Sequence, residues 1–321
     1  MSLGEFDIIA RYFTRKTTRA DVRIGIGDDA AVLDVPVDRR LVVAVDTIVA
    51  GVHFPVGTDA ADIGYRALAV NLSDLAAMGA QPAWMTLALS MPDAEPQWLD
   101  AFARGLFELA DRHEVALVGG DTVRGPLVVT IQVAGYVEPD RWLTRDGAQP
   151  GDVLFVSGVP GEAAAGLAVL QRQLPRSASA DHLLHRFLRP EPRLALGRTL
   201  RTLASAAMDV SDGLSTDLAK LCMASRCGAR IAIEQLPLSA AMSELFDAPT
   251  CLDYALAGGD DYEIIFSVPS ARLHELASRE HDCLITRIGE LTAGSAVEYT
   301  LHGRPVHREA QGYDHFAKRE P

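Results

Sequence analysis

The stretch DAADIGYRALAVNLSDLAAMG, residues 59–79, decides the fold of the first half of the chain. It is mostly apolar and long enough for a helix, and Gly79 is a residue typical of a helix end. We therefore predict a helix over residues 59–78. Asp74 stands inside this otherwise apolar segment, one helical turn from Asn71. A buried carboxylate without a partner is costly, so Asp74 is either a functional group or part of a polar side of the helix.

β-rich runs alternate with helical patterns on both sides of this helix. Strands are expected at residues 21–26, 41–46, 115–118, 127–137, 152–157, 230–233, 262–268 and 286–288, helices at 4–13, 96–113, 161–173, 192–204 and 212–224, and a polar loop at 172–181. This alternation predicts a mixed α/β fold. The stretch DGAQPGD, residues 146–152, is dense in turn-forming residues and marks a domain boundary, so two domains are expected at 1–148 and 149–321.

The composition is that of an ordinary globular protein, with 48% hydrophobic and 23% charged residues. The length of 321 residues corresponds to about two domains. The formal net charge of −13 argues against a general nucleic-acid binder, which needs a basic surface. It leaves phosphate ligands possible, provided that a cation stands between them and the acidic protein.

The chain shows no pattern of export or membrane insertion. No apolar run reaches the length of a membrane span, and the first residues lack the pattern of a secretory signal. The cysteines, Cys222, Cys227, Cys251 and Cys283, have no spacing typical of a metal site. We interpret them as reduced thiols of a cytoplasmic protein.

Aspartates stand at the ends of apolar runs throughout the chain. The set consists of Asp28, Asp29, Asp46, Asp121, Asp209, Asp212, Asp260 and Asp261. Because α/β folds place their ligands at the carboxyl ends of strands, such carboxylates favour a site for a hard cation, most simply Mg²⁺. A single aspartate after a strand is more often a turn or helix-capping residue, and Asp212 before Gly213 is the clearest example. The joint occurrence of so many such aspartates favours the metal site.

The sequence lacks the phosphate-binding loop, the dinucleotide fingerprint and the protein-kinase motifs. Two glycine pairs, Gly119-Gly120 and Gly258-Gly259, each precede an aspartate and would let the backbone approach a phosphate closely. Arg124 and Arg145 would reach phosphate oxygens through pairs of hydrogen bonds. Taken alone, each of these features is more often a tight turn or a solvated arginine.

Eight motifs that follow one another along the chain carry a family resemblance. They are GIGDDAA (25–31), DTIVAGVHF (46–54), LAVNLSDLAAMGAQP (68–82), VGGDTVRGP (118–126), LTRDGAQPGD (143–152), DVSDGLSTDL (209–218), AGGDDYE (257–263) and GYDHF (312–316). Together they resemble the thiamine-monophosphate kinase family of the aminoimidazole ribonucleotide synthetase (PurM-like) superfamily, over nearly the whole chain. The resemblance implies direct, in-line transfer of the γ-phosphoryl group of ATP to thiamine monophosphate, with several Mg²⁺ ions, to give thiamine diphosphate.

The resemblance also implies a fold and an assembly. It implies a two-domain PurM-like α/β fold, in which the N-terminal mixed sheet forms a barrel with that of a second copy in a homodimer. The N-terminal domain would bind ATP and Mg²⁺ and form the dimer, and the C-terminal domain would be an α/β unit. The partners expected are ATP, thiamine monophosphate and a second copy, with neither nucleic acid nor membrane.

Site residues follow from the resemblance where the motifs match. Those implied to hold Mg²⁺ are Asp29, Asp46, Asp74, Asp121, Asp209 and Asp212, with Asp46, Asp74 and Asp121 as the catalytic core. Those implied to contact ATP are Gly120, Asp121, Arg145 and Ser211, and those implied to contact thiamine monophosphate are His53, Asp260 and Tyr313. The chain departs from the family at Asp260, where Glu is common, and at Ala44 and Val45, where relatives often have Ser or Thr.

Three alternatives stay open at this point. Another ATP-using member of the superfamily would share several motifs, although Cys222 is too far along the chain for a selenophosphate synthetase and the carbamoyl dehydratase needs a C-terminal cysteine. A metal-dependent phosphatase would use the same aspartates without ATP. A sensor without catalytic activity would bind the same ligands but has little use for so many carboxylates.

Overall fold

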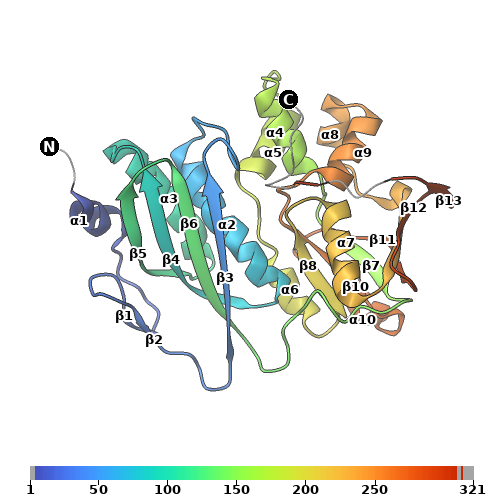
Figure 1. Cartoon of the computed structure of the whole chain (residues 1–321), viewed down its shortest axis with the longest axis horizontal. Coiled ribbons are helices and arrows are strands. Elements are labelled where there is room, and N and C mark those ends of the chain that lie inside the picture. The colour runs from blue at the N-terminus through green and yellow to red at the C-terminus, as the bar shows by residue number, and fades with distance from the viewer. Residues whose placement is uncertain (1–3, 309–311, 314–321) are drawn as a thin grey trace. The chain divides into compact units, whose positions relative to one another are not determined.

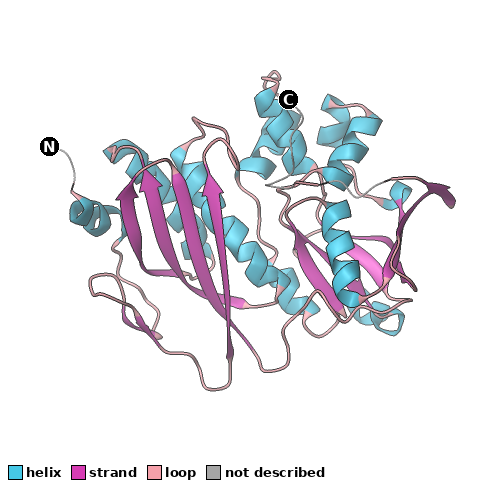
Figure 2. Cartoon of the chain, in the orientation of Figure 1, coloured by secondary structure: helices cyan, strands magenta, loops and turns pink. Residues whose placement is uncertain are grey.

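The computed structural model describes residues 4–308 and 312–313, and its contacts divide the chain into two compact units (Figure 1). Unit 1 contains the chain up to Leu75 together with Ala80–Trp142, and unit 2 contains Ala76–Gly79 and the chain from Leu143 onward. Each unit contains a sheet and helices (Figure 2), so the predicted mixed α/β class is confirmed. The domain limits of 1–148 and 149–321, and the roles given to the two domains, stay predictions.

Unit 1 is built on a four-stranded sheet with two long helices on one face (Figure 1). The strands are β3 (Arg40–Val49), β4 (Gln81–Met91), β5 (Ala116–Arg124) and β6 (Val128–Val137), in the order β3-β6-β4-β5. The helices on the sheet are α2 (Ala60–Ala77) and α3 (Pro96–Arg112). The N-terminal part adds α1 (Glu5–Ile8), the π-helix η1 (Ile9–Phe13), and a small sheet of β1 (Val22–Ile24) and β2 (Val32–Leu33).

The long helix predicted at residues 59–78 is confirmed by α2, which differs from it by one residue at each end. Leu68 and Leu75 on this helix are fully buried. Asn71 is buried as well, and its amide donates to the Ala67 carbonyl while its Oδ1 accepts from the backbone N–H of Asp46, both at 2.9 Å. Because β3 is an edge strand, part of its backbone lacks a strand partner. One asparagine side chain therefore ties the helix to the edge of the sheet.

Two glycines let α2 and α3 approach closely. A Cβ atom at Gly64 would lie 2.2 Å from the Phe102 carbonyl oxygen, and one at Gly105 would lie 1.8 Å from the Ala61 carbonyl oxygen. Both distances are far below van der Waals contact, so a side chain at either position would force the helices apart.

Unit 2 is built on a seven-stranded sheet in the order β13-β12-β9-β11-β7-β10-β8. Its strands are β7 (Val153–Ser157), β8 (Ala206–Val210), β9 (Gly228–Ala232), β10 (Glu263–Val268), β11 (Ile285–Thr292), β12 (Val297–Leu301) and β13 (Arg304–Val306). Its helices are α4 (Glu162–Gln171), α5 (Ala178–Leu188), α6 (Leu194–Leu200), α7 (Leu214–Ser225), α8 (Ala240–Leu245), α9 (Ala248–Ala257) and α10 (Leu273–Ala277). Leu154, Leu218 and Ile265 belong to the core between the sheet and α7.

The pairing of β8 with β10 brings two distant motifs together. The strands are antiparallel, and Val210 at the end of β8 lies opposite Glu263 at the start of β10. The loop that follows β8 and the loop that precedes β10 therefore meet at one end of the sheet.

The strands of unit 1 correct the predicted positions of two aspartates. The run predicted at 41–46 continues to Val49, and the run predicted at 115–118 continues to Arg124. Asp46 therefore lies inside its strand and not at its last position, and Asp121 lies inside its strand and not after it. The apolar runs end at these residues, but the backbone stays paired with β6 and β4 beyond them, and the pairing decides where a strand ends.

The structure contains several helices and strands that the sequence analysis did not predict. Strand β4 was not predicted, because Pro82 near its start argues against an interior strand; a register shift between Pro82 and Trp84 accommodates it. The loop predicted at 172–181 is wrong from Ala178 onward, where α5 begins. Ser177 caps that helix by accepting the N–H of Ala180. The other helices and strands missed are α8, α9, α10, β2, β8, β12 and β13.

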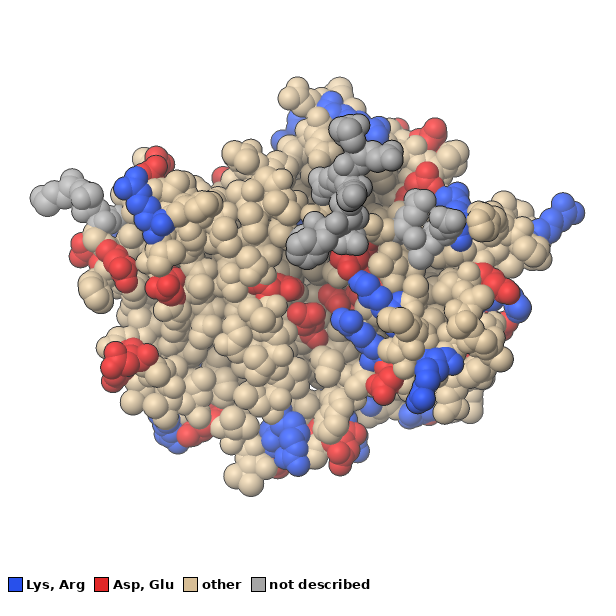
Figure 3. Space-filling model, viewed as in Figure 1, with Lys and Arg blue, Asp and Glu red and all other residues tan. Residues whose placement is uncertain are grey.

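Three further properties concern membrane-spanning helices, cysteines and surface charge. None of the helices in the described part of the chain combines the length and apolarity that a membrane crossing requires. All four cysteines are free thiols. On the face drawn in Figure 3, acidic and basic side chains are interspersed and uncharged residues form most of the surface.

We predict that Gly105→Ala destabilises unit 1 by about 1–3 kcal/mol, because the new methyl group collides with the Ala61 carbonyl. Urea unfolding followed by circular dichroism measures this loss. Arg104→Ala, on the exposed side of the same helix, is the matched control and should change the free energy of unfolding little. A Gly105→Ala protein as stable as its parent would contradict the close approach of α2 and α3.

Candidate functional site

A cavity of about 750 Å³ in unit 1 brings together acidic and glycine residues from two motifs. Its polar wall contains Asp28 and Asp29 from the loop after β1, and Gly120 and Asp121 from β5. Ligand pockets for small molecules commonly have volumes of about 300–1,000 Å³. Three of the predicted site residues, Asp29, Gly120 and Asp121, thus line one ligand-sized cavity.

Gly120 is needed where β4 and β5 run side by side. A Cβ atom at this position would lie 1.8 Å from the Leu87 carbonyl oxygen, so no side chain fits. The next residue, Asp121, is exposed, and its Oδ1 accepts the N–H of Thr122 at 2.9 Å. The close approach of the strands therefore presents the Asp121 carboxylate at the edge of the cavity.

Another part of the cavity lining is apolar. It consists of Phe6, Ile9, Ala10 and Phe13 from the N-terminal helical segment. Part of this segment is the π-helix η1, a conformation often found at functional sites. The cavity can therefore receive a ligand with a flat apolar part and a charged part.

Asp46 lies at a different place in unit 1 from Asp121. Strand register puts Asp46 opposite Ile131, Ile131 opposite Leu87, and Leu87 opposite Gly120. Three strand spacings separate Asp46 from β5, which is about 14 Å. Because side chains alternate along a strand, Asp121 also points to the other face of the sheet. The structure does not bring these two predicted metal ligands together.

Asp46 lies near the end of β3 and His53 follows that strand, whereas Asp74 lies on α2, which contacts β3 at Asp46. Asp74 stands one helical turn after Asn71, the residue that holds the backbone of Asp46. His53 follows in the turn after β3, and its Nδ1 accepts the N–H of Val49 at 3.0 Å. That nitrogen is then unprotonated, and the neutral ring carries its proton on Nε2.

Five predicted residues of unit 2 lie in or beside the end of β8 and the loops after β8 and before β10. They are Asp209, Ser211, Asp212, Asp260 and Tyr313. The N–H of Asp260 donates to the Ser211 carbonyl at 2.8 Å, and the N–H of Tyr313 donates to the Asp212 carbonyl at 3.0 Å. The last three residues of the GYDHF motif lie outside the described part of the chain. Residues implied to contact ATP, metal and acceptor thus share one end of this sheet.

Two charged residues that the sequence reasoning missed organise this end. Fully buried Asp217 accepts the N–H groups of Ser211 and Asp212 at 2.9 Å each. Lys220 lies 2.5 Å from a carboxylate oxygen of Asp212 and 2.8 Å from one of Asp217. Asp212 does not cap α7, because Gly213 occupies the capping position. The spacing of Asp217 and Lys220, three residues apart on one helix, was the available signal.

The loop before β10 is conformationally strained. Asp260 has φ of 71° and Tyr262 has φ of 53°, in the left-handed region that L-residues rarely adopt. Such a conformation costs about 1–2 kcal/mol per residue and persists only where the surroundings impose it. The hydroxyl of Tyr262 also donates to a carboxylate oxygen of Asp260 at 3.3 Å.

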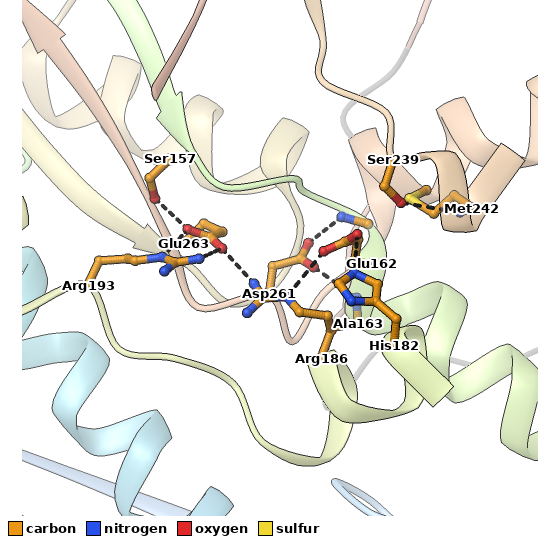
Figure 4. A network of polar contacts seen from close by, with 11 residues as sticks. Ser157, Glu162, Ala163, His182, Arg186, Arg193, Ser239, Met242, Asp261 and Glu263 are labelled. Atoms are coloured by element: carbon orange, nitrogen blue, oxygen red, sulfur yellow. Dashed lines mark hydrogen bonds and ion pairs between the residues drawn. The ribbon is translucent and has the colours of Figure 1, made fainter. Parts of the chain in front are cut away.

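A buried ionic network stands behind this loop (Figure 4). Glu263 has no exposed surface, and its carboxylate accepts from Arg193, Arg186 and Ser157. Burial raises the pKa of Glu263, but the two guanidinium groups and the hydroxyl outweigh it and hold the pKa below its usual value. Glu263 is therefore ionised at neutral pH. No sequence pattern pointed to this network, because its members come from four separate segments.

The two arginines proposed for phosphate binding lie apart from these groups. Arg145 is exposed, and its carbonyl accepts from Ser225 at the last position of α7, whereas Ser211 precedes the first. A helix of 12 residues is about 18 Å long, so the backbones of Arg145 and Ser211 stand at opposite ends of α7. Arg124 is exposed and binds the Pro92 carbonyl and Asp93.

The oxygen atoms that line the unit 1 cavity are suitable ligands for a hard cation. Its described lining offers carboxylates and backbone groups but neither cysteine nor histidine. Among the described residues, no three acidic, histidine or cysteine side chains form a ready-made metal site. Mg²⁺ usually takes one or two carboxylates and completes its shell with water and substrate phosphates, so the set fits a cation that arrives with a phosphate ligand.

Comparisons with known proteins agree on one family. The model for the N-terminal domain of AIR synthase related proteins matches residues 27–137, and the model for their C-terminal domain matches residues 149–302. The thiamine-monophosphate kinase of Escherichia coli K12 is 48% identical over 323 residues, which is 99% of each chain. The predicted two-domain PurM-like fold is thereby confirmed, whereas the barrel formed by two copies stays a prediction.

Solved structures give the same result. A thiamine-monophosphate kinase from Stenotrophomonas maltophilia K279a superposes with a TM-score of 0.87 at 46% identity, covering 95% of this chain and 99% of that one. A structure described as AaThiL complexed with AMPPCP and TMP has a TM-score of 0.78 at 31% identity, covering 91% and 92%.

Because the pKa of Glu263 is lowered on folding, its contribution to stability is present above the unfolded value of 4.5 and is lost as the pH falls through the folded value. We predict that the thermal unfolding temperature falls between about pH 5 and pH 3, and that it falls less steeply in Glu263→Gln. At pH 7 this variant is destabilised by about 3 kcal/mol, since the largely buried Arg193 and Arg186 lose the charge of Glu263, although Arg186 keeps Glu162 as a partner. Glu290→Gln, at an exposed pair with Arg230, is the control. Parallel pH curves for Glu263→Gln and its parent would contradict the assignment.

Proposed function

Because the chain belongs to the thiamine-monophosphate kinase family, we propose that it transfers the γ-phosphoryl group of ATP to thiamine monophosphate, forming thiamine diphosphate and ADP. The observation that carries this proposal is the family match over nearly the whole of both chains. A related structure complexed with AMPPCP, an ATP analogue, and TMP supports the choice of both substrates.

The charge of the acceptor explains what the protein has to do. A phosphate monoester has a second pKa of about 6, so at neutral pH the acceptor is a dianion and needs no general base. The obstacle is repulsion between two polyanions, and in-line transfer is achieved by positioning and by charge neutralisation. No lysine or arginine is among the described residues that line the unit 1 cavity. A cation must therefore supply the positive charge.

Asp29 and Asp121 are the residues that would hold Mg²⁺ in this cavity. The ion, when bound, neutralises phosphate charge and orients the transferred group. Gly120 allows the β4 and β5 backbones to approach and so presents Asp121, and the apolar wall from Phe6 to Phe13 suits the base of ATP. Asp46, Asp74, Asp209 and Asp212 are proposed as further metal ligands on the family resemblance, although Asp212 already has Lys220 as a cationic partner.

The remaining contacts are also proposals. Ser211 uses its backbone N–H for Asp217 and its carbonyl for Asp260, so its hydroxyl is proposed to contact ATP, together with Arg145. His53, Asp260 and Tyr313 are proposed to contact thiamine monophosphate. We also propose a cytoplasmic location, which the four free thiols favour.

The proposed activity is tested with purified protein, ATP, Mg²⁺ and thiamine monophosphate, and with free thiamine as a parallel acceptor. Thiamine diphosphate and ADP in equal amounts, resolved by mass spectrometry, are expected, with no product from free thiamine. Phosphate released from thiamine monophosphate without ATP would replace the kinase by a phosphatase.

Asp121→Asn should lower kcat by about a hundredfold or more, since it removes the charge that binds the cation but keeps the hydrogen bond to Thr122. Its unfolding temperature should stay near that of the parent, because the side chain is exposed. Asp93→Asn, at an exposed aspartate paired with Arg124, is the control with normal activity. Normal turnover in Asp121→Asn would remove Asp121 from the site.

We propose a homodimer formed through the open face of the unit 1 sheet. Leu41, Val43 and Val45 alternate along edge strand β3 and are 46%, 54% and 59% exposed. A contiguous row of exposed apolar side chains on one sheet face is typical of a surface that another protein covers. A second copy of the same sheet presents the complementary apolar surface.

Val43→Lys should convert the dimer into a monomer, because a charge would be buried at its centre without a partner. Analytical ultracentrifugation at micromolar concentration measures the mass. Met223→Lys, on α7 and 76% exposed, adds the same charge elsewhere and should leave the dimer intact. A parent protein that sediments as a monomer would disprove the homodimer.

A further inference from the structure

Glu263 is a completely buried carboxylate directly after the strained loop 258–262. Its oxygens accept from Arg193 Nη2 at 2.5 Å and Nε at 2.6 Å, from Arg186 Nη2 at 2.6 Å and from Ser157 Oγ at 2.6 Å. These partners come from the segment before α6, from α5 and from β7 (Figure 4). Three elements of unit 2 therefore converge on the first residue of β10.

The loop itself is held on two sides. Asp261 accepts the N–H groups of Gly161 and Ala163 at the start of α4, at 2.6 and 3.1 Å. The N–H groups of Asp260 and Tyr262 donate to the carbonyls of Ser211 and Val210, both at 2.8 Å. Side chains 261 and 263 thus anchor the loop to the interior, and its backbone is joined to the end of β8.

We propose that Arg193 and Arg186 are positioning residues that act through Glu263: they hold loop 258–262 in its left-handed conformation and so set where the Asp260 carboxylate meets thiamine monophosphate. The identity of the ligand rests on the proposed function, whereas the holding of the loop does not.

The chemistry of the network favours positioning over bulk stability. A buried ion pair costs desolvation energy, and well-packed apolar residues often stabilise a fold equally well. A guanidinium group, in contrast, fixes a carboxylate in direction through two parallel hydrogen bonds. The structure also reserves space for this carboxylate, because a Cβ atom at Gly158 would lie 2.0 Å from Glu263 Oε1. A loop with two residues in the left-handed conformation keeps that conformation only if the residue that anchors it is held in a fixed orientation.

Arg193→Lys tests the proposal, since it keeps the charge and removes the two-pronged contact. The KM for thiamine monophosphate should rise about tenfold while the KM for ATP changes less than about twofold, because the variant displaces Asp260. Hydrogen exchange at the Asp260 and Tyr262 amides, measured by mass spectrometry without substrate, should become faster.

A second variant guards against misfolding. Arg193→Met combined with Glu263→Gln removes one positive and one negative charge together, so no carboxylate is left buried with too few partners. The same rise in KM and the same faster exchange are expected. Leu183→Ala is the matched control, because it opens a cavity on α5, one turn from Arg186, without touching the network. It should lower the unfolding temperature but change neither KM.

The outcomes separate the inference from the proposed function. Parent values for both the KM and the amide exchange in the two network variants would overturn the inference. An equal rise in KM in Leu183→Ala would overturn it as well, since general loosening would then explain the effect. A parent protein that forms no thiamine diphosphate would overturn the proposed function, and the exchange rates alone would then decide whether the arginines hold the loop.

Discussion

The burial of one charge, that of Glu263, is the constraint on which the arrangement of unit 2 depends. A carboxylate with no exposed surface stays ionised only where cations and hydrogen-bond donors replace water. Here Arg193, Arg186 and Ser157 supply them, and each comes from a different element. Strand β7, helix α5 and the start of α6 must therefore all stand next to the first residue of β10. The strained loop that carries Asp260 ends at this fixed point.

Unit 1 depends on close backbone approach instead of buried charge. Gly64 and Gly105 let α2 and α3 touch, and Gly120 lets β4 and β5 pair where Asp121 faces the cavity. Asn71 joins α2 to the edge strand at Asp46. Small or polar residues at these few positions decide the spacing of the layers, and the carboxylates are presented as a result.

The two units supply different parts of the proposed chemistry. In unit 1 the cavity has an acidic wall around Asp29 and Asp121 and an apolar wall around Phe13, which suits a nucleotide that arrives with its cation. In unit 2 the ends of β8 and β10 bring Ser211, Asp212 and Asp260 side by side. Next to this group, Lys220 pairs with Asp212 and Asp217, so part of the negative charge there is offset before any ligand binds.

The sequence by itself determined the mixed α/β class, the helix α2 and the residue types of the site, because these follow from local apolar patterns and from motifs read in order. Only the tertiary structure decided that Asp121 and Asp46 stand three strands apart on opposite faces, since strand order and register are set by pairing between distant segments. The same holds for β4, whose Pro82 hides it from local rules but whose pairing on both sides makes it an interior strand. It also holds for Glu263, Arg186 and Arg193, because long-range contacts between charged residues leave no periodic trace in a sequence. The sequence shows which chemical groups the chain carries, and the tertiary structure determines which of these groups lie in contact.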